Sequence, residues 1–244
     1  MTLETRVLGM GRSVFRLPSE LALLHQEVGV GEYIQVQLSP RASQAWCAQR
    51  ARDLMVGAGF QLEGRCTFQN ERATMLVERI RSLSDSVGSG LQVLIVGLNP
   101  SPYSADSGIP YGRPGNRFWP AALASGLVTT DRDVHHALSS HNLGFTDLVR
   151  RTTKRADEVS RGEFELGFGR VSRLIEWLTP GIVCFVGLSA WRTVVNRKAV
   201  PGLQTQQIGS SQVYVMPHTS GLNAHARLED LTEHLATVKK LVGK

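Results

Sequence analysis

The chain has 244 residues, of which 42% are hydrophobic and 20% are charged. This composition is typical of a globular protein with a packed core, and it excludes a mainly disordered, collagenous or coiled-coil chain. Lysine and arginine number 27 against 21 aspartates and glutamates, and the resulting net charge of +6 favours a polyanionic partner without identifying it.

The three cysteines, Cys47, Cys66 and Cys184, are widely spaced and odd in number. This pattern predicts reduced thiols in a cytoplasmic protein, because a disulfide scaffold needs paired cysteines. We expect neither a metal nor a cofactor, since the seven histidines show no ligand spacing. No apolar run is long enough for a membrane helix, and the N-terminus lacks the order of a signal peptide.

Residues 1–90 are expected to form an α/β appendage of unknown role. Apolar spacing predicts three elements in it, namely strands over 33–38 and 60–68 and a helix over 42–57. This part contains no glycine-rich phosphate loop and no histidine or cysteine cluster, so we assign it no catalytic role. It ends in the Ser/Gly-rich stretch 82–90, which we interpret as a flexible linker to a second domain over 91–244.

Residues 91–244 alternate short apolar runs with helical segments. Three continuous apolar runs predict buried strands, over 91–96, 182–186 and 213–216. Helical spacing predicts five helices, over 118–125, 133–140, 162–178, 189–196 and 227–242. The alternation of strands and helices predicts a three-layer α/β/α sandwich with a mainly parallel central sheet. The stretch 144–147 is interpreted as a turn.

Two polar loops each follow a predicted buried strand. The first begins Gly97-Leu98-Asn99-Pro100-Ser101, and the second runs Pro217-His218-Thr219-Ser220-Gly221-Leu222. Because ligands of open α/β sheets bind beyond the carboxyl ends of the strands, both loops are expected to open onto one site. The first loop continues into a Gly/Pro-rich stretch, in which Tyr111 offers a face for stacking on a planar ligand.

Three blocks carry a resemblance to a known family. They read Gly-Leu-Asn-Pro-Ser at 97–101, Gly-Ile-Pro-Tyr-Gly-Arg-Pro-Gly-Asn-Arg-Phe-Trp at 108–119 and Thr-Ser-Gly-Leu at 219–222. Their order and separation resemble the mismatch-specific uracil/thymine-DNA glycosylase family over about residues 91–242. The resemblance implies a uracil-DNA glycosylase-like fold and a base excision repair enzyme, which rotates a damaged base out of DNA before hydrolysing its N-glycosidic bond.

The resemblance assigns Asn99 to the position that holds the attacking water. Its carboxamide oxygen can accept a hydrogen bond from water, although residue type alone favours a turn asparagine before proline. Tyr111 takes the place of a stacking aromatic, usually Phe in the family, and packing beneath the loop is the alternative. We further expect contacts with the substrate from Gly97, Leu98, Pro100, Ser101 and Asn116, the last of which resembles an asparagine that pins the loop.

In the second loop, His218 stands where mismatch-specific members often have Asn, and it resembles the histidine of other uracil-DNA glycosylases. An imidazole there can donate to uracil O2 and stabilise the leaving anion; the alternative is a surface histidine. Leu222 resembles the wedge that replaces the extruded nucleotide, with Ser220 and Gly221 contacting DNA beside it. The alternative for Leu222 is an apolar contact with the last helix.

Two further departures from the family pattern bear on specificity. Ser101 replaces the usual glycine after Asn-Pro, which alters the backbone approach to the pyrimidine edge and adds a hydroxyl. Ala224 replaces an arginine with which some relatives hold the opposite strand, so we expect less dependence on a mismatch. Arg150 and Arg151 begin the densest basic run, for which we predict phosphate contacts, with a solvated charged face as the alternative.

The leading hypothesis is a monofunctional uracil-DNA glycosylase that acts as a monomer on DNA containing uracil or a mismatch. It is expected to be monofunctional because neither loop contains a lysine that could form a Schiff base. Two alternatives stay open: a non-catalytic DNA-damage-binding module of the same fold, and a glycosylase that acts chiefly on hypoxanthine. The expected location is the cytoplasm, with nucleoid association if the source is prokaryotic.

Overall fold

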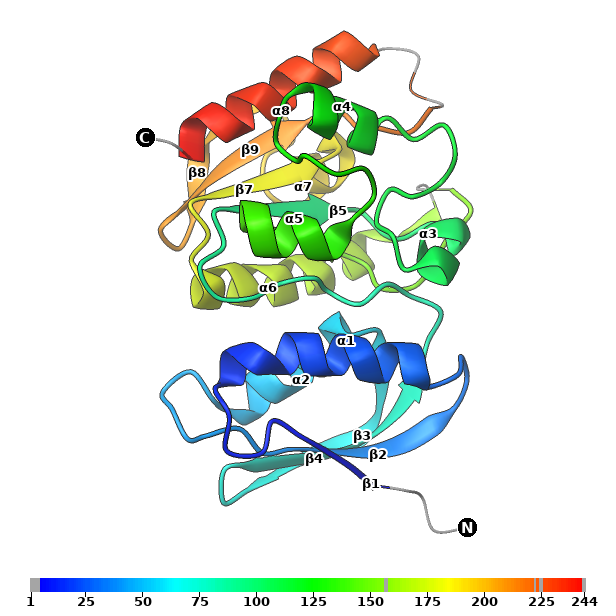
Figure 1. Cartoon of the computed structure of the whole chain (residues 1–244), viewed down its shortest axis with the longest axis vertical. Helices are drawn as coiled ribbons and strands as arrows, with labels where there is room; N and C mark the ends of the chain where they lie inside the picture. Colours follow the sequence, from blue (N-terminus) through cyan, green and yellow to red (C-terminus); the bar gives the residue numbers. More distant parts are fainter. Residues whose placement is uncertain (1–4, 156–157, 222, 224–225, 243–244) are drawn as a thin grey trace.

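The structure is a computed structural model that describes residues 5–155, 158–221, 223 and 226–242. It contains two β-sheets, one in the first third of the chain and one in the remainder (Figure 1). Within the described residues, no helix has the length and apolar character needed to cross a membrane.

The N-terminal sheet has four strands and carries helices between itself and the rest of the chain (Figure 1). Its elements are β1 Thr5–Leu8, the 3-10 helix η1 Val14–Arg16, α1 Leu17–Glu27, β2 Tyr33–Leu38, α2 Ala48–Gly57, β3 Phe60–Gln69 and β4 Arg72–Arg79. The spatial order is β1-β2-β4-β3, with β1 parallel to β2 and the other pairs antiparallel. The predicted strands at β2 and β3 are confirmed, and the predicted helix forms from Ala48 onward; β1, α1 and β4 were not predicted.

The second sheet has five strands in the order β6-β5-β7-β9-β8. Its elements are β5 Val93–Gly97, α3 Pro102–Ser107, α4 Phe118–Ala124, α5 Val134–His141, β6 Leu143–Asp147, α6 Arg161–Leu178, β7 Ile182–Val186, α7 Leu188–Val194, β8 Gly202–Ile208, β9 Ser211–Met216 and α8 Leu228–Val242. Strands β6, β5, β7 and β9 are parallel, and β8 runs antiparallel to β9 at one edge. This arrangement agrees with the mainly parallel sheet that the sequence predicts.

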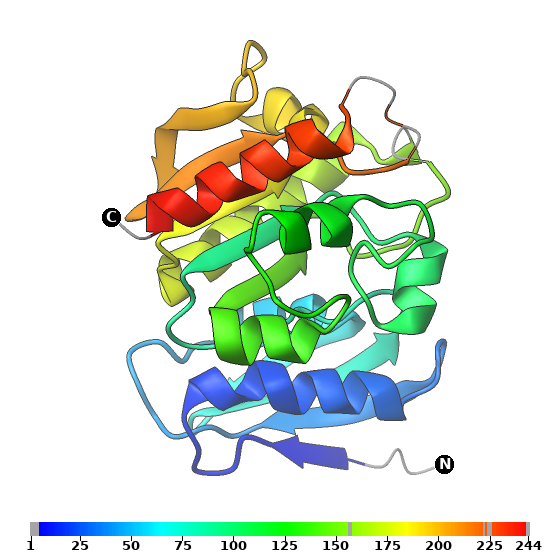
Figure 2. The ribbon, with the colours of Figure 1, turned by 45° about the horizontal axis from the view of Figure 1, so that its top comes forward.

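Helices cover both faces of the second sheet because its central strands are apolar on both sides. Leu94 and Val183 pack in one apolar cluster with α6 and α7, whereas Ile95 and Cys184 pack in another with α4, α5 and α8. Every residue of β5 and β7 is buried as a result. Figure 2 shows α8 in red and α4 and α5 in green over the same face.

The stretch 144–147, predicted as a turn, belongs to the buried strand β6, so that prediction was wrong. Gly144 lies against the main chain of Ser86, where a Cβ would come within 2.9 Å of the Ser86 carbonyl oxygen. The glycine therefore permits two chain segments to approach closely and does not mark a turn.

The stretch 82–90 is packed against the second sheet, so the prediction of a flexible linker was also wrong. Leu83, Asp85 and Val87 are buried, and Val87 belongs to the same apolar cluster as α6. The main chains of Ser86 and Phe145 exchange hydrogen bonds of 2.9 and 2.8 Å. The small polar residues of this stretch thus serve packing and pairing.

Asp85 connects the two parts of the chain through a buried ion cluster. Its carboxylate accepts hydrogen bonds from Arg150 at 2.9 Å, Arg170 at 2.7 Å and the Thr146 hydroxyl at 2.7 Å. Arg150 also donates to the carbonyl oxygen of Gly57, the last residue of α2, at 2.8 Å. Because Arg150 is only 7% exposed, the predicted phosphate contact of Arg150 was wrong.

Helix α6 makes further contacts with the N-terminal part. The ring of Trp177 stacks on Phe15 at a centroid distance of 4.9 Å and lies 4.5 Å from the Arg50 guanidinium. Arg173 pairs with the buried carboxylate of Asp53 at 2.7 Å. The N-terminal part is therefore held against α6 by apolar, cation–π and ionic contacts together.

Candidate active site

The two predicted loops lie at the same edge of the second sheet. Asn99 follows β5 and His218 follows β9, and both strands run parallel to β7 between them. Their carboxyl ends are therefore two strand spacings apart, about 10 Å. In Figures 1 and 2, α3, which follows the first loop, lies on the same side of the molecule as the chain beyond β9.

The Asn99 carboxamide is held in one orientation by its surroundings. Its amide nitrogen donates to the Thr153 hydroxyl at 2.8 Å and to the Arg151 carbonyl oxygen at 3.2 Å. A carbonyl oxygen can only accept, and the Thr153 hydroxyl already donates to the Arg155 carbonyl at 2.7 Å, so the group facing both must be the amide nitrogen. The carboxamide oxygen of Asn99 is thereby directed away from these partners and can accept a hydrogen bond.

Gly97, the last residue of β5, separates two buried polar groups. A Cβ at this position would overlap the Asp147 carboxylate and would lie 3.0 Å from the Tyr111 hydroxyl. The Tyr111 hydroxyl is buried and has no hydrogen-bond partner in the described part of the chain. Asp147 is 9% exposed, and burial raises the pKa of its carboxyl to about 6. A buried phenol without a partner, next to a buried carboxyl, favours a ligand that brings polar groups of its own.

Tyr111 supplies an aromatic face at this site. Its φ is 57°, in the left-handed region that residues with side chains seldom occupy. One face of its ring stacks on Phe118 at a centroid distance of 4.4 Å and an interplanar angle of 20°. The residue as a whole is half-buried, whereas its hydroxyl is fully covered by the protein. Both interpretations of Tyr111, packing and stacking on a ligand, are therefore compatible with its position.

The other predicted residues of the first loop are largely engaged by the protein. Gly97 and Leu98 accept main-chain hydrogen bonds from the two residues that follow β6, at 3.0 and 2.9 Å, and Pro100 is buried. Ser101 caps α3: its hydroxyl accepts from the Ser104 amide and donates to the Ser104 hydroxyl, both at 3.1 Å. Because the Ser101 hydroxyl is used in this cap, nothing in the structure supports its predicted contact with a base.

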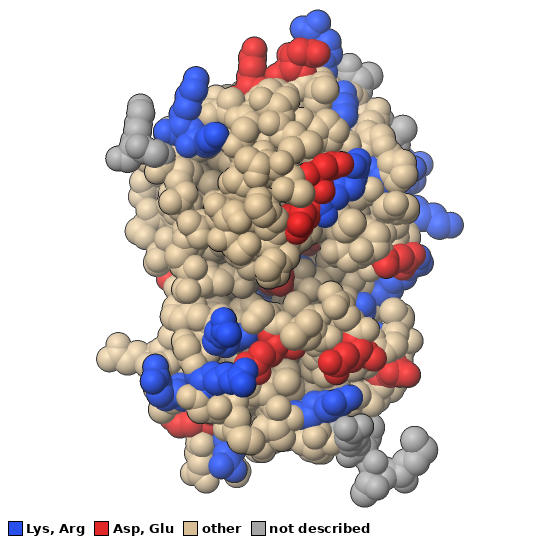
Figure 3. Space-filling view, in the orientation of Figure 1, with Lys and Arg blue, Asp and Glu red and all other residues tan. Residues whose placement is uncertain are grey.

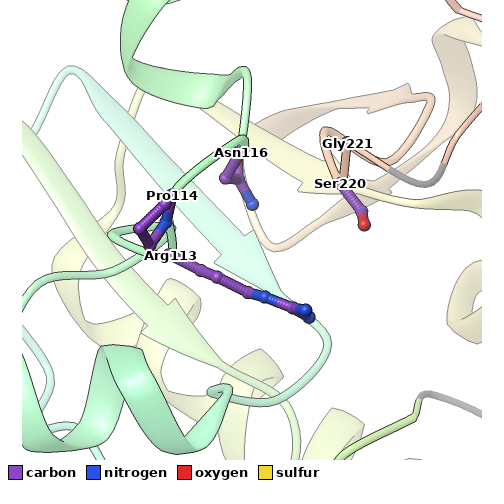
Figure 4. Close-up of a pocket in the computed structure, with 5 residues that line it drawn as sticks. All are labelled: Arg113, Pro114, Asn116, Ser220 and Gly221. Atoms are coloured by element: carbon purple, nitrogen blue, oxygen red, sulfur yellow. The ribbon is translucent and has the colours of Figure 1, made fainter.

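A cavity of about 100 Å³ opens between the Gly/Pro-rich loop and the second loop. It is lined by Arg113, Pro114, Asn116, Ser220 and Gly221, whose side chains and backbone enclose it from two sides (Figure 4). Asn116 accepts a hydrogen bond from the Phe118 amide at 2.9 Å. Asn99, Tyr111 and His218 are not among the residues that line this cavity. The predicted Leu222 and Ala224 lie outside the described residues.

Arg117 holds the two loops together, a role that the sequence analysis missed. Its main-chain amide donates to the Thr219 carbonyl at 2.9 Å. Its guanidinium donates to the carbonyl oxygens of Ser220 and Asn223, both at 2.8 Å, and to that of Ala226. One half-buried cation thus binds the backbone carbonyls of Ser220, Asn223 and Ala226 together.

His218 is exposed and lies beside the end of β7. A Cβ on Gly187, which follows β7 with a φ of 112°, would lie 3.6 Å from the His218 Cβ. Partial burial and, secondarily, the Arg117 cation lower the pKa of the His218 imidazole below its usual 6.5. The ring is therefore neutral at pH 7 and keeps one N–H as a donor.

Arg151, unlike Arg150, is exposed at the surface near Asn99. Its guanidinium pairs with Glu163 at 2.5 Å, and this cation lowers the pKa of the Glu163 carboxyl to about 2. Figure 3 shows several Lys and Arg side chains along the margin of the molecule on which α3 lies in Figure 1. A polyanion can approach the carboxyl edge of the sheet from that side.

Two site residues were not predicted, for identifiable reasons. Asp147 was assigned to a turn, although a carboxylate at the carboxyl end of a buried strand could have indicated a ligand site. Thr153 was part of the basic run 150–155, and nothing in its sequence context points to Asn99. Within the described residues, no group of three or more His, Cys, Asp or Glu is arranged to hold a metal ion.

Replacing Asp147 with asparagine should make the folded protein more stable at neutral pH. The folded state holds the Asp147 proton more tightly than the unfolded chain, because burial raises its pKa from 3.8 to about 6. The contribution of Asp147 to stability therefore falls as pH rises through that window and is lowest above about 6. Urea unfolding should show Asp147→Asn to be more stable at pH 7.5, by up to about 3 kcal/mol, and nearly equal to the wild type at pH 4. An equal difference at both pH values would contradict this.

The mainly parallel sheet with polar loops at its carboxyl edge places the second part of the chain in the open α/β class, whose ligands bind at that edge. The family model of the Uracil DNA glycosylase superfamily matches residues 85–241, and the chain belongs to this superfamily. A solution NMR structure of a protein from Methanosarcina acetivorans, described provisionally as a uracil DNA glycosylase, is 22% identical to it with a TM-score of 0.46; that match covers 66% of this chain and 97% of the other.

Proposed function

We propose that the chain is a monofunctional DNA glycosylase of the mismatch-specific type, which hydrolyses the bond between an extruded uracil and its deoxyribose. Membership of the superfamily supports a DNA glycosylase activity on uracil-type lesions. The observation that carries the proposal is the fixed carboxamide of Asn99. Its nitrogen is bound by Thr153 and Arg151, so its oxygen is the end that can hold a water for attack on C1′.

In this proposal the base lies over Tyr111, on the ring face that Phe118 does not cover. The close approach permitted by Gly97 brings the Asp147 carboxyl to the edge of the base. A carboxylate accepts from an N–H, and uracil presents one at N3. Hypoxanthine also presents an N–H, so the contact does not by itself select a pyrimidine.

The reaction separates into two tasks for this chain. As the glycosidic bond breaks, positive charge develops on the sugar and negative charge on the leaving base. Asn99 holds the water, and the neutral His218 donates to uracil O2 to stabilise the leaving anion. A carboxamide cannot act as a general base, so the attack depends on positioning and on the quality of the leaving group. With no lysine in either loop, the product is an abasic site in an unbroken strand.

The remaining residues are assigned to DNA binding and to support of the fold. Ser220, Gly221 and Leu222 form the wedge segment, and Arg151 contacts a phosphate. We place the boundary of the glycosylase domain before residue 82 and not at 90, because Asp85 and Val87 pack with the second sheet. The N-terminal part is then an accessory unit docked on α6.

The test is excision from oligonucleotides that carry one lesion each: uracil in a single strand, opposite guanine and opposite adenine, and hypoxanthine opposite thymine. Alkali converts each abasic product into a strand break that can be counted on a gel. Excision from the uracil substrates is expected, with only modest dependence on the mismatch. If uracil is released in none of the three contexts, the proposal is rejected. If hypoxanthine alone is released, hypoxanthine and not uracil is the substrate.

A further inference from the structure

The cavity between residues 113–116 and 220–221 is lined by hydrogen-bond donors and contains no acidic residue. Arg113 extends its guanidinium along the cavity, and the Asn116 and Ser220 side chains are directed toward the same space (Figure 4). The oxygen of the Asn116 carboxamide is used by the Phe118 amide, so its NH2 group is the end left for a ligand. A guanidinium beside an amide N–H is suited to an anionic ligand rich in acceptors.

Arg113 differs from the other arginines near this edge in its contacts. Arg117 is bound to three backbone carbonyls, Arg150 to Asp85 and Arg151 to Glu163. In contrast, no hydrogen bond or ion pair is made by the Arg113 side chain within the described residues. An exposed guanidinium that is not paired with a carboxylate can form a bidentate pair with an incoming anion, because no existing ion pair has to be broken first.

The walls of the cavity are already fixed. A Cβ on Gly221 would lie 2.7 Å from the carbonyl oxygen of Gly115, so the two loops touch through their backbones. Arg117 holds the second loop through the carbonyls of Ser220 and Asn223. The volume of about 100 Å³ exceeds the share of about 30 Å³ that one water takes in the liquid, and it can hold a tetrahedral anion.

We propose that this cavity is the subsite for one backbone phosphate of DNA, adjacent to the extruded nucleotide, and that Arg113 is the cation that binds it. The inference rests on the proposed function, because it takes the polyanion to be DNA. The strand whose nucleotide is rotated out must pass the wedge segment, which begins at Ser220 in the cavity wall. Arg113 thereby fixes the register of that strand, so that the extruded base enters the site near Asn99.

The inference is tested by equilibrium binding of the full chain to a duplex that carries 2′-fluoro-deoxyuridine, on which glycosidic cleavage is suppressed. Arg113→Ala should bind about tenfold more weakly. Its plot of log K against log salt should be less steep by about 0.9, the value for one duplex phosphate. Arg113→Lys should keep the slope and part of the affinity. Arg72→Ala, which removes an exposed arginine of β4 in the N-terminal sheet, should change neither.

A neutral methylphosphonate at each phosphate around the lesion then locates the contact. At one position it should weaken the wild type about tenfold and leave Arg113→Ala nearly unchanged. The inference would be overturned if the methylphosphonate weakened binding equally in the wild type and in Arg113→Ala at every position. It would also be overturned if the affinity lost in Arg113→Ala changed with the base opposite the lesion and not with the phosphate charge. Excision of ordinary deoxyuridine is measured in parallel. If the methylphosphonate effect depends on Arg113 but no uracil is excised, only the proposed function is contradicted. If uracil is excised but no methylphosphonate effect depends on Arg113, only this inference is contradicted.

Discussion

Replacing Asp85 with alanine should destabilise the protein by about 3–5 kcal/mol, because it leaves two buried guanidinium groups without their anion. Asp85 is 8% exposed and pairs with Arg150 and Arg170, which are 7% and 5% exposed. The cost arises mainly from the two uncompensated charges and not from the loss of the bonds themselves. Chemical unfolding of the full chain measures it as a lower midpoint at an unchanged slope.

Asp106→Ala is the matched control for this substitution. Asp106 is also an aspartate paired with an arginine, Arg81, but both side chains are about half exposed. Exposed ion pairs contribute little, because water screens them and the side chains lose entropy on pairing. If Asp85→Ala were no more destabilising than Asp106→Ala, Asp85 would not be the group that compensates the buried arginines.

The fold was predictable where buried elements have a recognisable apolar pattern, such as the continuous apolar runs of fully buried strands. Strands β5, β7 and β9 follow from such runs, and the helices from α4 to α8 follow from the helical spacing of their apolar residues. Strand β8 was missed because it is an edge strand with alternating exposed residues, among them Thr205 and Gln207. Strand β6 was missed because Gly144 and Asp147 are unusual in a buried strand. Gly144 is needed there for a close approach to another chain segment, and Asp147 lies at a polar site. Both are features of the tertiary structure.

The site was predictable only as far as its loops. The order of the motifs points to Asn99, Tyr111 and the second loop, but not to what orients them. The orientation of the Asn99 carboxamide depends on a carbonyl and a hydroxyl 52 and 54 positions away in the chain. Arg150 was misassigned for a similar reason, since its partner Asp85 lies 65 positions earlier. A basic run in a sequence does not show which of its members are buried.

Asn99→Ala should lower the single-turnover rate of uracil excision by about 10²–10³-fold, with little change in affinity for DNA. The alanine cannot hold the attacking water, whereas the cavity, the wedge segment and Tyr111 are unaltered. Asn99→Asp should retain or increase activity, because a carboxylate can act as a general base and favours the cationic sugar. Thr153→Val removes only one of the two contacts that orient the carboxamide, so its rate should lie between those of Asn99→Ala and the wild type.

Single-turnover excision from a uracil–guanine duplex, measured side by side for the wild type, Asn99→Ala and Asn99→Asp, tests the central claim most directly. The account predicts rapid release of uracil by the wild type, a large loss in the alanine variant and activity in the aspartate variant. An alanine variant as fast as the wild type, or a completely inactive aspartate variant that still folds and binds DNA, would contradict the assignment of Asn99 as the residue that holds the water.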